Sequence, residues 1–366
     1  MSINHLLFGC ILVASSCVAS AQETRLRPRV TFSQVLRRED ANKDGKVTKE
    51  EFKASPKLFE RFDRDGDGVL TKTDFAEAVA PQNRRRIGQN VPEDMTVLRD
   101  VVFGKGGGRE LTMHIVMPKE KATAPAPVYV WIHGGGWLGG KKDGGIGQTV
   151  PLVRRGFVGA TIEYRLTGEA AFPAQIEDCK CAIRYLRAHA ETYNIDADRI
   201  AVGGSSAGGH LAALLGTSGG VKELEGSGGW PDQSSTVQAV VDLYGPTDFK
   251  AFVTTEGFES HNRAGSPESK LLGGGEVITN VDGIKRVNPI TYVDESDPPF
   301  LIIHGTKDRT VPVNQSEAIH KALQAAKVSS KLHVIEGAGH GGPQFSDPEI
   351  RAMQVDFLTK TFGIDE

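Results

Sequence analysis

Cysteine is scarce in this sequence. The 366 residues include four, and two of them, Cys10 and Cys17, fall within the first 21 positions. Cys179 and Cys181 stand two apart in a segment with a helical pattern, where side chains at that spacing do not face each other. This spacing makes them poor disulfide partners, and two lone cysteines make no metal site. We expect both to be buried free thiols.

The sequence also lacks a strong net charge of either sign. Its 43 lysines and arginines are nearly balanced by 46 aspartates and glutamates, for a formal net charge of −3, so no nucleic-acid partner is expected. Hydrophobic residues make up 39% and charged residues 24% of the chain, which allows a large core and excludes wholesale disorder.

The first 21 residues contain no Asp, Glu, Lys or Arg. Their apolar run, from Leu6 to Ala14, is too short to span a bilayer as a stable anchor. The small residues Ala19-Ser20-Ala21 suit cleavage before Gln22. We therefore expect a signal peptide over residues 1–21, no membrane span, and a secreted or periplasmic protein.

Two acidic segments within residues 32–80 match the calcium-loop pattern D-x-[DN]-x-[DN]-G-x5-E. The expected oxygen ligands of the first loop are Asp40, Asn42, Asp44, the carbonyl of Lys46, and Glu51. Those of the second loop are Asp63, Asp65, Asp67, the carbonyl of Val69, and Asp74. Because the second loop ends in aspartate, whose side chain is shorter than glutamate, we expect weaker or more magnesium-tolerant binding there.

This segment resembles an EF-hand pair, which implies structural binding of Ca²⁺. The alternative is two acidic surface turns that bind no metal. No Met-rich apolar groove accompanies the loops, so a structural or docking role, toward a protein or a polysaccharide, is favoured over a switch. Residues 81–95 are polar and contain two prolines, which is typical of a linker.

From residue 96 to 366, short apolar runs alternate with helical patterns, which predicts βαβ units on a mostly parallel sheet. One run, residues 200–202, leads into Gly204-x-Ser206-x-Gly208 and then an Ala/Leu-rich helical pattern. This context favours Ser206 as a nucleophile at a sharp strand-to-helix turn. Ser205 is the rival, but its own register lacks the second glycine.

Another buried strand, residues 128–132, leads into His133-Gly134-Gly135-Gly136-Trp137. Consecutive glycines leave backbone N–H groups uncovered, so they can point at a developing negative oxygen. We expect the oxyanion donors to be the N–H groups of Gly135, Gly136 and Ala207. No metal or cofactor is needed for such chemistry.

The candidate acid and base follow later strands. Asp308 lies just beyond the strand at residues 299–304, and its rival Asp248 follows the strand at residues 237–243. His340 stands on a glycine-flanked loop after the last strand. Ser206, Asp308 and His340 thus occur in the order serine, acid, histidine.

With these motifs, residues 96–366 resemble the α/β-hydrolase superfamily, and within it secreted bacterial carboxylesterases of the feruloyl and acetyl-xylan esterase type. Further segments that carry the resemblance are Glu163-Tyr164-Arg165-Leu166, Phe172-Pro173-Ala174-Gln175, Asp178 and Asp198-Arg199-Ile200. The resemblance implies an α/β-hydrolase fold, a mostly parallel central sheet with helices on both faces, preceded by the small helical EF-hand pair. It also implies a serine carboxylic ester hydrolase that forms an acyl-enzyme and removes acetyl or feruloyl groups from plant polysaccharide or short acyl esters.

Two other functions stay open. The segment His304-Gly-x-x-Asp308 is similar to one in prolyl-oligopeptidase-like serine peptidases, although residues 22–95 are too short for the β-propeller that usually precedes such a domain. The chain could instead be a calcium-dependent binding module with an idle hydrolase-like body. Residues 249–290 are less regular and glycine-rich, and we expect them to form a cap or binding insertion that sets acyl specificity.

Overall fold

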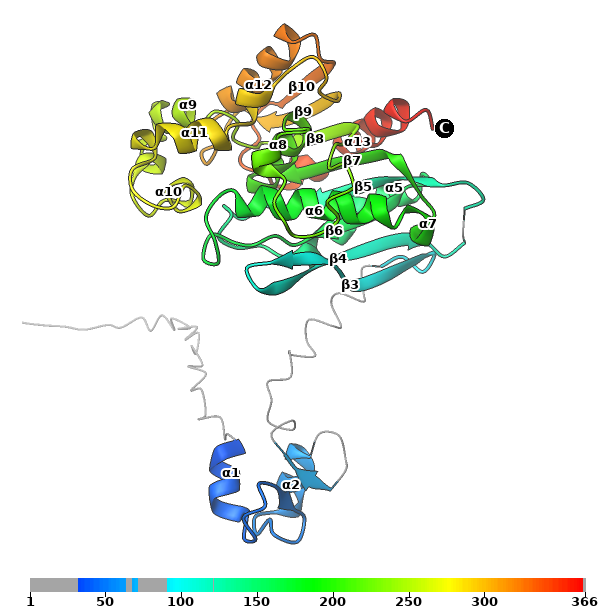
Figure 1. Ribbon diagram of the computed structural model, residues 1–366, viewed down its shortest axis with the longest axis vertical. Coiled ribbons are helices and arrows are strands. Elements are labelled where there is room, and N and C mark those ends of the chain that lie inside the picture. Colours follow the sequence, from blue (N-terminus) through cyan, green and yellow to red (C-terminus); the bar gives the residue numbers. More distant parts are fainter. Residues whose placement is uncertain (1–31, 64–67, 72–90, 121, 365–366) are drawn as a thin grey trace, which may run out of the picture. The chain divides into compact units, whose positions relative to one another are not determined.

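The computed structural model describes residues 32–63, 68–71, 91–120 and 122–364. The chain divides into two compact units, Met1–Arg84 and Arg85–Glu366 (Figure 1). The expected signal peptide, residues 81–90 of the expected linker, and the second-loop ligands Asp65, Asp67 and Asp74 lie outside the described residues. Within the described ranges, no helix is both long and apolar enough to cross a membrane.

The described part of the smaller unit contains two helix–loop segments. Helix α1 (Phe32–Glu39) precedes the first acidic loop, and α2 (Pro56–Phe62) precedes the second. The loops are joined by the short antiparallel strands β1 (Val47–Thr48) and β2 (Val69–Leu70). A small core lies under this pair, in which the rings of Phe52 and Phe59 meet edge to face with centroids 5.4 Å apart.

Apolar runs of the larger unit form an eight-stranded sheet. Its strands are β3 (Met95–Gly106), β4 (Arg109–Pro118), β5 (Ala126–Ile132), β6 (Val158–Ile162), β7 (Ile195–Ser205), β8 (Ala239–Leu243), β9 (Phe300–Gly305) and β10 (Ser330–Ile335). Their order is β10-β9-β8-β7-β5-β6-β4-β3. Neighbours from β10 to β6 are parallel, whereas β4 is antiparallel to both β3 and β6. The expected mostly parallel sheet is confirmed.

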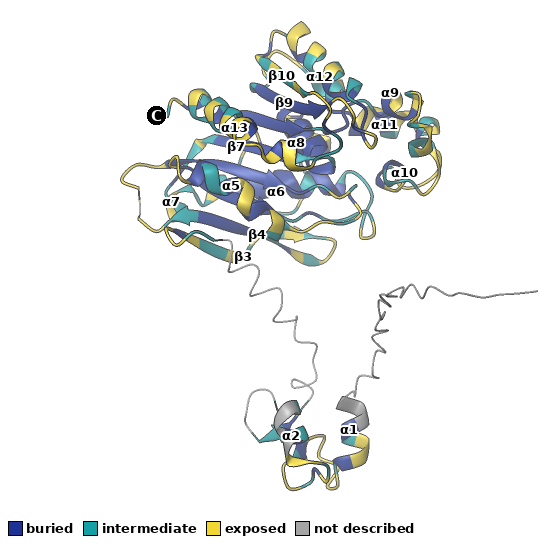
Figure 2. Ribbon diagram, turned by 180° about the vertical axis from the view of Figure 1, so that it is seen from behind, coloured by how far each residue is buried: buried dark blue, intermediate teal, exposed yellow. Residues whose placement is uncertain are grey.

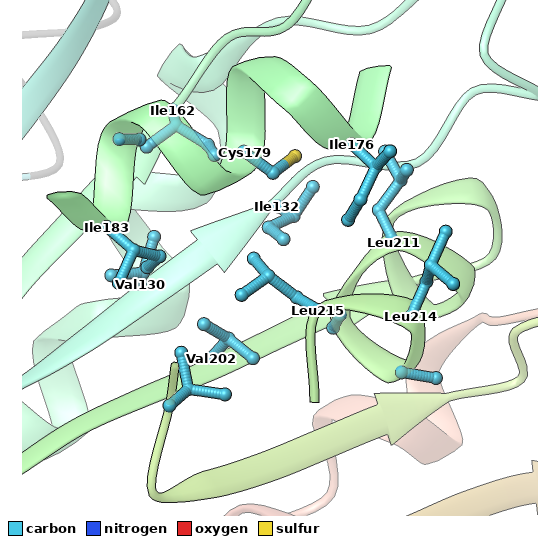
Figure 3. Close-up of a cluster of buried hydrophobic side chains, with 14 of the residues drawn as sticks. Val130, Ile132, Ile162, Ile176, Cys179, Ile183, Val202, Leu211, Leu214 and Leu215 are labelled. Carbon is cyan, nitrogen blue, oxygen red and sulfur yellow. The ribbon is translucent and has the colours of Figure 1, made fainter. Parts of the chain in front are cut away.

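Helices cover both faces of this sheet because its central strands are apolar on both sides. Along β5, Val130 and Ile132 pack with α6 (Ala174–Ala188), α8 (Ala207–Thr217) and α12 (Asn314–Ala325). Tyr129 and Trp131 face the opposite cluster, with α5 (Ile146–Val153) and α13 (Pro348–Thr361). Figure 2 shows the buried strands between the two helical layers. Figure 3 shows side chains of α6 and α8 meeting those of β5, β6 and β7.

Residues 249–290, between β8 and β9, are more helical than expected. They contain the short helices α9 (Phe249–Thr254), η3 (Glu259–Asn262), α10 (Pro267–Leu271), η4 (Val277–Thr279) and α11 (Val281–Val287), followed by η5 (Pro289–Tyr292). Polar side chains start these helices: Ser266 Oγ accepts from Ser269 N, and Asn280 Oδ1 accepts from Gly283 N. The remaining short helices of the described chain are η1 (Lys142–Gly145), α7 (Ala190–Tyr193), η2 (Lys222–Leu224) and η6 (Pro343–Ser346).

Helix α6 carries buried groups of two kinds. Cys179 and Cys181 are free and buried, which confirms the expectation for these thiols. Lys180 is fully buried, and its Nζ donates to the carbonyl of Ser218 at the end of α8 (2.6 Å) and to Glu225 (2.8 Å). Arg184, also buried, donates to the same carboxylate at 2.6 Å. Glu225 therefore neutralises two buried cations, one of which holds the end of α8.

Replacing Glu225 with glutamine should destabilise the larger unit because both cations then lack a counter-charge. We expect the free energy of unfolding to fall by about 2–4 kcal/mol. This is less than for a fully buried pair, because 28% of the Glu225 side chain is exposed. Urea unfolding followed by tryptophan fluorescence measures this. The exposed neighbour Glu223, changed to glutamine, is the control and should shift stability by less than about 0.5 kcal/mol. Equal effects of the two substitutions would contradict the role of Glu225 as the counter-charge of the two cations.

Candidate active site

Ser206 lies at a sharp turn between a strand and a helix. Strand β7 ends at Ser205 and α8 begins at Ala207, so Ser206 alone forms the bend, with φ 55° and ψ −122°. A positive φ is costly for a residue with a side chain and persists only where the surroundings enforce it. Here the N–H of Ser206 donates to the carbonyl of Leu243 (2.8 Å), and its carbonyl accepts from His210 N (2.9 Å). The turn places the Ser206 hydroxyl at the edge of the sheet where the parallel strands end.

The two glycines of the motif are required by crowding. A Cβ on Gly204 would overlap the carbonyl of Gly208, and one on Gly208 would overlap the carbonyl of Ile132. Helix α8 therefore starts in direct backbone contact with the ends of β5 and β7. This close approach explains why the pattern Gly204-x-Ser206-x-Gly208 needs glycine at its first and last positions.

The structure brings Ser206, His340 and Asp308 into one hydrogen-bonded array. His340 Nε2 lies 2.9 Å from Ser206 Oγ, and His340 Nδ1 lies 2.7 Å from Asp308 Oδ2. The rival acid, Asp248, is elsewhere: its carboxylate caps α9 by accepting from Ala251 N at 3.1 Å. The rival serine, Ser205, is the last residue of β7 and precedes the bend.

Asp308 is buried but remains ionised. Burial raises the pKa of its carboxyl, yet hydrogen bonds from His304, His340 and the N–H of Val311 outweigh burial and hold the pKa well below the ordinary value. The N–H groups of Thr310 and Val311 both donate to Oδ1, at 2.8 and 2.9 Å. A carboxylate fixed in this way can hold the His340 ring with its Nδ1 proton toward Asp308, which leaves Nε2 free to accept the proton of Ser206.

Two aromatic neighbours of this array were not predicted from the sequence. The His304 ring is fully buried, with Nδ1 2.7 Å from Ser316 Oγ. Its Nε2 lies 2.9 Å from the carbonyl of Val311 and 3.3 Å from the Asp308 carboxylate. Tyr244, just after β8, sets its ring edge against His340 with centroids 4.7 Å apart. His304 supports the acid, and Tyr244 restrains the base.

The glycine-rich loop after β5 lies beside the serine. Gly135, Gly136 and Trp137 all have positive φ, at 119°, 60° and 57°. Among the described residues, the N–H groups of Gly135 and Gly136 donate to no backbone carbonyl. Ala207, as the first residue of α8, likewise has no carbonyl one turn before it within the helix. Three uncommitted N–H groups thus come from residues that line one cavity with Ser206.

This cavity has a volume of about 500 Å³. Besides Ser206, His340 and the glycine-rich loop, its lining includes Tyr244, Pro246, Thr310 and Val311. His261, Pro267 and Glu268 also line it, so residues 249–290, called the cap below, border the cavity. The volume suits a small acyl ester, and the apolar wall includes Trp137.

A buried histidine links the glycine-rich loop to the nucleophile helix and the cap. Trp137 Nε1 donates to Nδ1 of His210, in α8, at 3.3 Å, and His210 Nε2 donates to the carbonyl of Val287 at the end of α11 (2.8 Å). Both ring nitrogens are used only if His210 is neutral, with its proton on Nε2. This role of His210 could not be predicted from the sequence, because Trp137 and Val287 are distant from His210 along the chain.

The segments that carry the family resemblance contact the start of the glycine-rich loop and one another. Tyr164 donates from its hydroxyl to the carbonyl of His133 (3.0 Å), and the two rings stack with centroids 4.4 Å apart. The guanidinium of Arg165 donates to both carboxylate oxygens of the buried Asp178, at 2.8 and 2.9 Å. Gln175 donates to the carbonyl of Arg165 at 3.0 Å. These residues shape the scaffold and do not line the Ser206 cavity.

The first acidic loop of the smaller unit presents oxygen atoms around a tight turn. Asp40 Oδ2 accepts from Gly45 N (3.1 Å), and Glu51 accepts from Thr48 N (3.0 Å). Asp40 Oδ1 is buried without a hydrogen-bond partner, a gap that a bound cation would fill. In the second loop Asp63 Oδ2 accepts from Gly68 N at 3.0 Å, the bond equivalent to that of Asp40. No three acidic, His or Cys side chains converge as a metal cluster within the described ranges.

The strand order, the Ser206 bend and the array with His340 and Asp308 define an α/β-hydrolase fold, preceded by the helical unit. The sequence model of the BD-FAE family matches residues 113–323, more than half of the chain, and the protein belongs to this family. The EF-hand model matches residues 34–54 and 57–79, so the smaller unit contains an EF-hand pair.

Known proteins similar to this chain include esterases. Esterase LipC of Mycobacterium tuberculosis is 33% identical over 226 residues, which cover 61% of this chain and 55% of LipC. The chain thus spans little more than half the length of that relative. A truncated carbohydrate esterase from gut microbiota is 34% identical with a TM-score of 0.67, covering 74% of this chain and 98% of its own. Propionate-bound esterase 2 of Thermogutta terrifontis is 26% identical, with a TM-score of 0.62 and coverages of 75% and 98%.

The neutral state of His210 makes folding sensitive to acid. Burial lowers the pKa of His210 to about 4, although the bond to Val287 opposes the shift. Below the ordinary pKa of about 6.5 the unfolded chain takes up a proton that the folded chain refuses. The stability that neutral His210 contributes is therefore complete above pH 6.5 and is lost as the pH falls toward 4.

From pH 7 to pH 4, the wild-type protein should lose on the order of 3 kcal/mol more stability than the His210→Gln variant. Glutamine retains a donor and an acceptor but does not titrate. The three tryptophans, at positions 131, 137 and 230, all lie in the larger unit, so urea unfolding followed by fluorescence reports that unit. Parallel pH curves for the two proteins would contradict the prediction.

Proposed function

We propose that this protein is a serine carboxylic ester hydrolase that works through an acyl-enzyme on Ser206. The observation that carries the proposal is the array of Ser206, His340 and Asp308 beside three uncommitted N–H groups in one cavity. The similarity to LipC and to a carbohydrate esterase supports the same reaction. It also weighs against the peptidase alternative, and the complete array weighs against an idle hydrolase body.

In the proposed reaction Ser206 Oγ attacks the ester carbonyl while its proton passes to His340 Nε2. The carbonyl oxygen becomes negative and is bound by the N–H groups of Gly135, Gly136 and Ala207. His340 then gives its proton to the leaving alkoxide, and the alcohol departs. Water attacks the acyl-enzyme as His340 accepts one of its protons, and Ser206 recovers its own proton as the acid leaves. Asp308 stabilises the positive ring in both steps.

We propose acetyl and other short acyl groups as the substrates, carried on plant polysaccharide or on simple alcohols, with feruloyl as a larger alternative. The cavity volume of about 500 Å³ accommodates such groups. The propionate bound to the Thermogutta terrifontis esterase supports a short acyl group. We further propose a secreted or periplasmic location, on the pattern of residues 1–21.

We also propose that the EF-hand pair binds Ca²⁺ as a structural ion. In the first loop the ligands would be Asp40, Asn42, Asp44, the Lys46 carbonyl and Glu51, all of which offer the oxygen donors that Ca²⁺ prefers. The unpartnered Asp40 Oδ1 supports this assignment. An ion held there would neutralise the acidic loop and stabilise the unit, which could dock to a protein or a polysaccharide.

Ser206→Ala should lower kcat for p-nitrophenyl acetate by at least about 1,000-fold, because no other group can form the acyl-enzyme. Ser205→Ala is the matched control, since it removes the same hydroxyl one residue earlier, and should retain activity within about tenfold. Circular dichroism checks that both variants fold. If Ser206→Ala stays active and Ser205→Ala does not, the nucleophile is misassigned.

Calcium should bind the full chain and raise the melting temperature of the smaller unit, with little change in ester turnover. Isothermal titration with CaCl₂ measures the binding, and Asp40→Ala should remove the heat from the first loop. Glu50→Gln, which leaves the ligand set intact, is the control. An absence of heat with the wild-type chain would contradict structural calcium binding. A loss of turnover on chelation would contradict a purely structural role.

A further inference from the structure

Two cap residues in the Ser206 cavity have no role in the catalytic array. Glu268 and His261 both line the cavity, and Glu268 is only 4% exposed. Glu268 Oε2 and His261 Nδ1 approach to 3.0 Å, but they are not aligned for a hydrogen bond, and each atom is buried without a hydrogen-bond partner. A buried carboxylate oxygen without a donor is costly, so this pair is incomplete.

The pair is held beside the glycine-rich loop. Glu268 follows Pro267 at the start of α10, and a Cβ on Gly136 would lie 3.4 Å from the Pro267 side chain, so α10 abuts the glycine-rich loop. Ser266 fixes the two residues relative to each other: its Oγ caps α10 and donates to the carbonyl of His261 at 2.7 Å. The His261 ring also packs on Phe252, with centroids 4.6 Å apart.

The chemistry of the pair matches a hydroxyl group. A carboxylate only accepts hydrogen bonds, an imidazole N–H donates one, and a hydroxyl has one proton to give and two lone pairs that accept. A purely aliphatic acyl chain or alcohol would leave Glu268 unsatisfied, whereas a hydroxyl beside the pair would donate to the carboxylate and accept from the imidazole N–H. The rest of the cavity lining, including Pro246, Pro267 and Val311, offers no comparable charged group.

We propose that Glu268 and His261 form a hydroxyl-binding subsite of the Ser206 cavity, so that the favoured substrates are esters that carry a free hydroxyl on the alcohol or on the acyl group. The hydroxyl belongs either to the alcohol, as in an acetylated sugar, or to the acyl group, as in a hydroxycinnamoyl ester. The inference rests on the proposed ester hydrolysis and adds the substrate class. Glu268 binds the hydroxyl and takes no part in the proton transfers at Ser206.

The test uses two pairs of esters that differ in their hydroxyl groups. Monoacetyl methyl xyloside and tetrahydropyran-4-yl acetate differ in the hydroxyls of the alcohol. Methyl 4-hydroxycinnamate and methyl 4-methoxycinnamate differ in the hydroxyl of the acyl group. For at least one pair, wild-type kcat/KM should be at least tenfold higher for the hydroxylated member, and the pair that responds identifies the source of the hydroxyl.

Glu268→Leu should reduce that ratio of kcat/KM by about 10- to 100-fold, the range expected for one hydrogen bond to a charged acceptor. Glu268→Gln keeps an acceptor and should restore part of the preference. Glu276→Gln, an exposed cap residue, is the control and should leave the ratio unchanged. His261→Phe keeps the ring packing against Phe252 and should also lower the ratio.

The outcomes separate the two levels of the proposal. If the wild-type chain hydrolyses none of the four esters or p-nitrophenyl acetate, the proposed hydrolase function fails. If it hydrolyses them without preferring a hydroxylated member, or if Glu268→Leu lowers kcat/KM equally for both members of each pair, the subsite is overturned while the hydrolase function stands. The wild-type preference is measurable even if a variant does not fold.

Discussion

The backbone at Ser206 is the constraint on which the rest of the larger unit depends. A serine at φ 55° is stable only because β7, α8 and β8 surround it, and the helix start touches the strand ends through Gly204 and Gly208 without intervening side chains. The bend exposes the hydroxyl at the sheet edge. It also leaves the N–H of Ala207 uncommitted next to Gly135 and Gly136. The strained backbone at Ser206 thus positions the nucleophile and also the N–H of Ala207, one of the groups that face a developing oxyanion.

Two buried polar groups near Ser206 are held in opposite charge states. Asp308 is kept ionised by donors from His304, His340 and the backbone, so it can stabilise a positive imidazole. His210 is kept neutral by burial, so it can accept from Trp137 and donate to Val287. The first group supports the chemistry, and the second connects the glycine-rich loop to the cap that carries Glu268 and His261.

Much of this organisation could be predicted from the sequence. The buried strands, the bend at Ser206 and the preference for Asp308 over Asp248 follow from local patterns, because strand ends and glycine turns are encoded by neighbouring residues. The supporting contacts could not be predicted. His210, His304 and the pair of Glu268 and His261 act through partners from separate elements, and a lone polar residue in a helical or irregular segment carries no local sign of its partner. The short helices of the cap are a further difference from the expected irregular segment, and Ser266 and Asn280 cap two of them.

The central claim is that Ser206 is the nucleophile of an ester hydrolase. Its most direct test is covalent trapping: the full chain is treated with a fluorophosphonate, digested and examined by mass spectrometry. We predict one adduct per chain, on Ser206, which forms rapidly at neutral pH and is prevented when His340 is replaced by alanine. Labelling of Ser205, or no labelling of a folded chain, would contradict it.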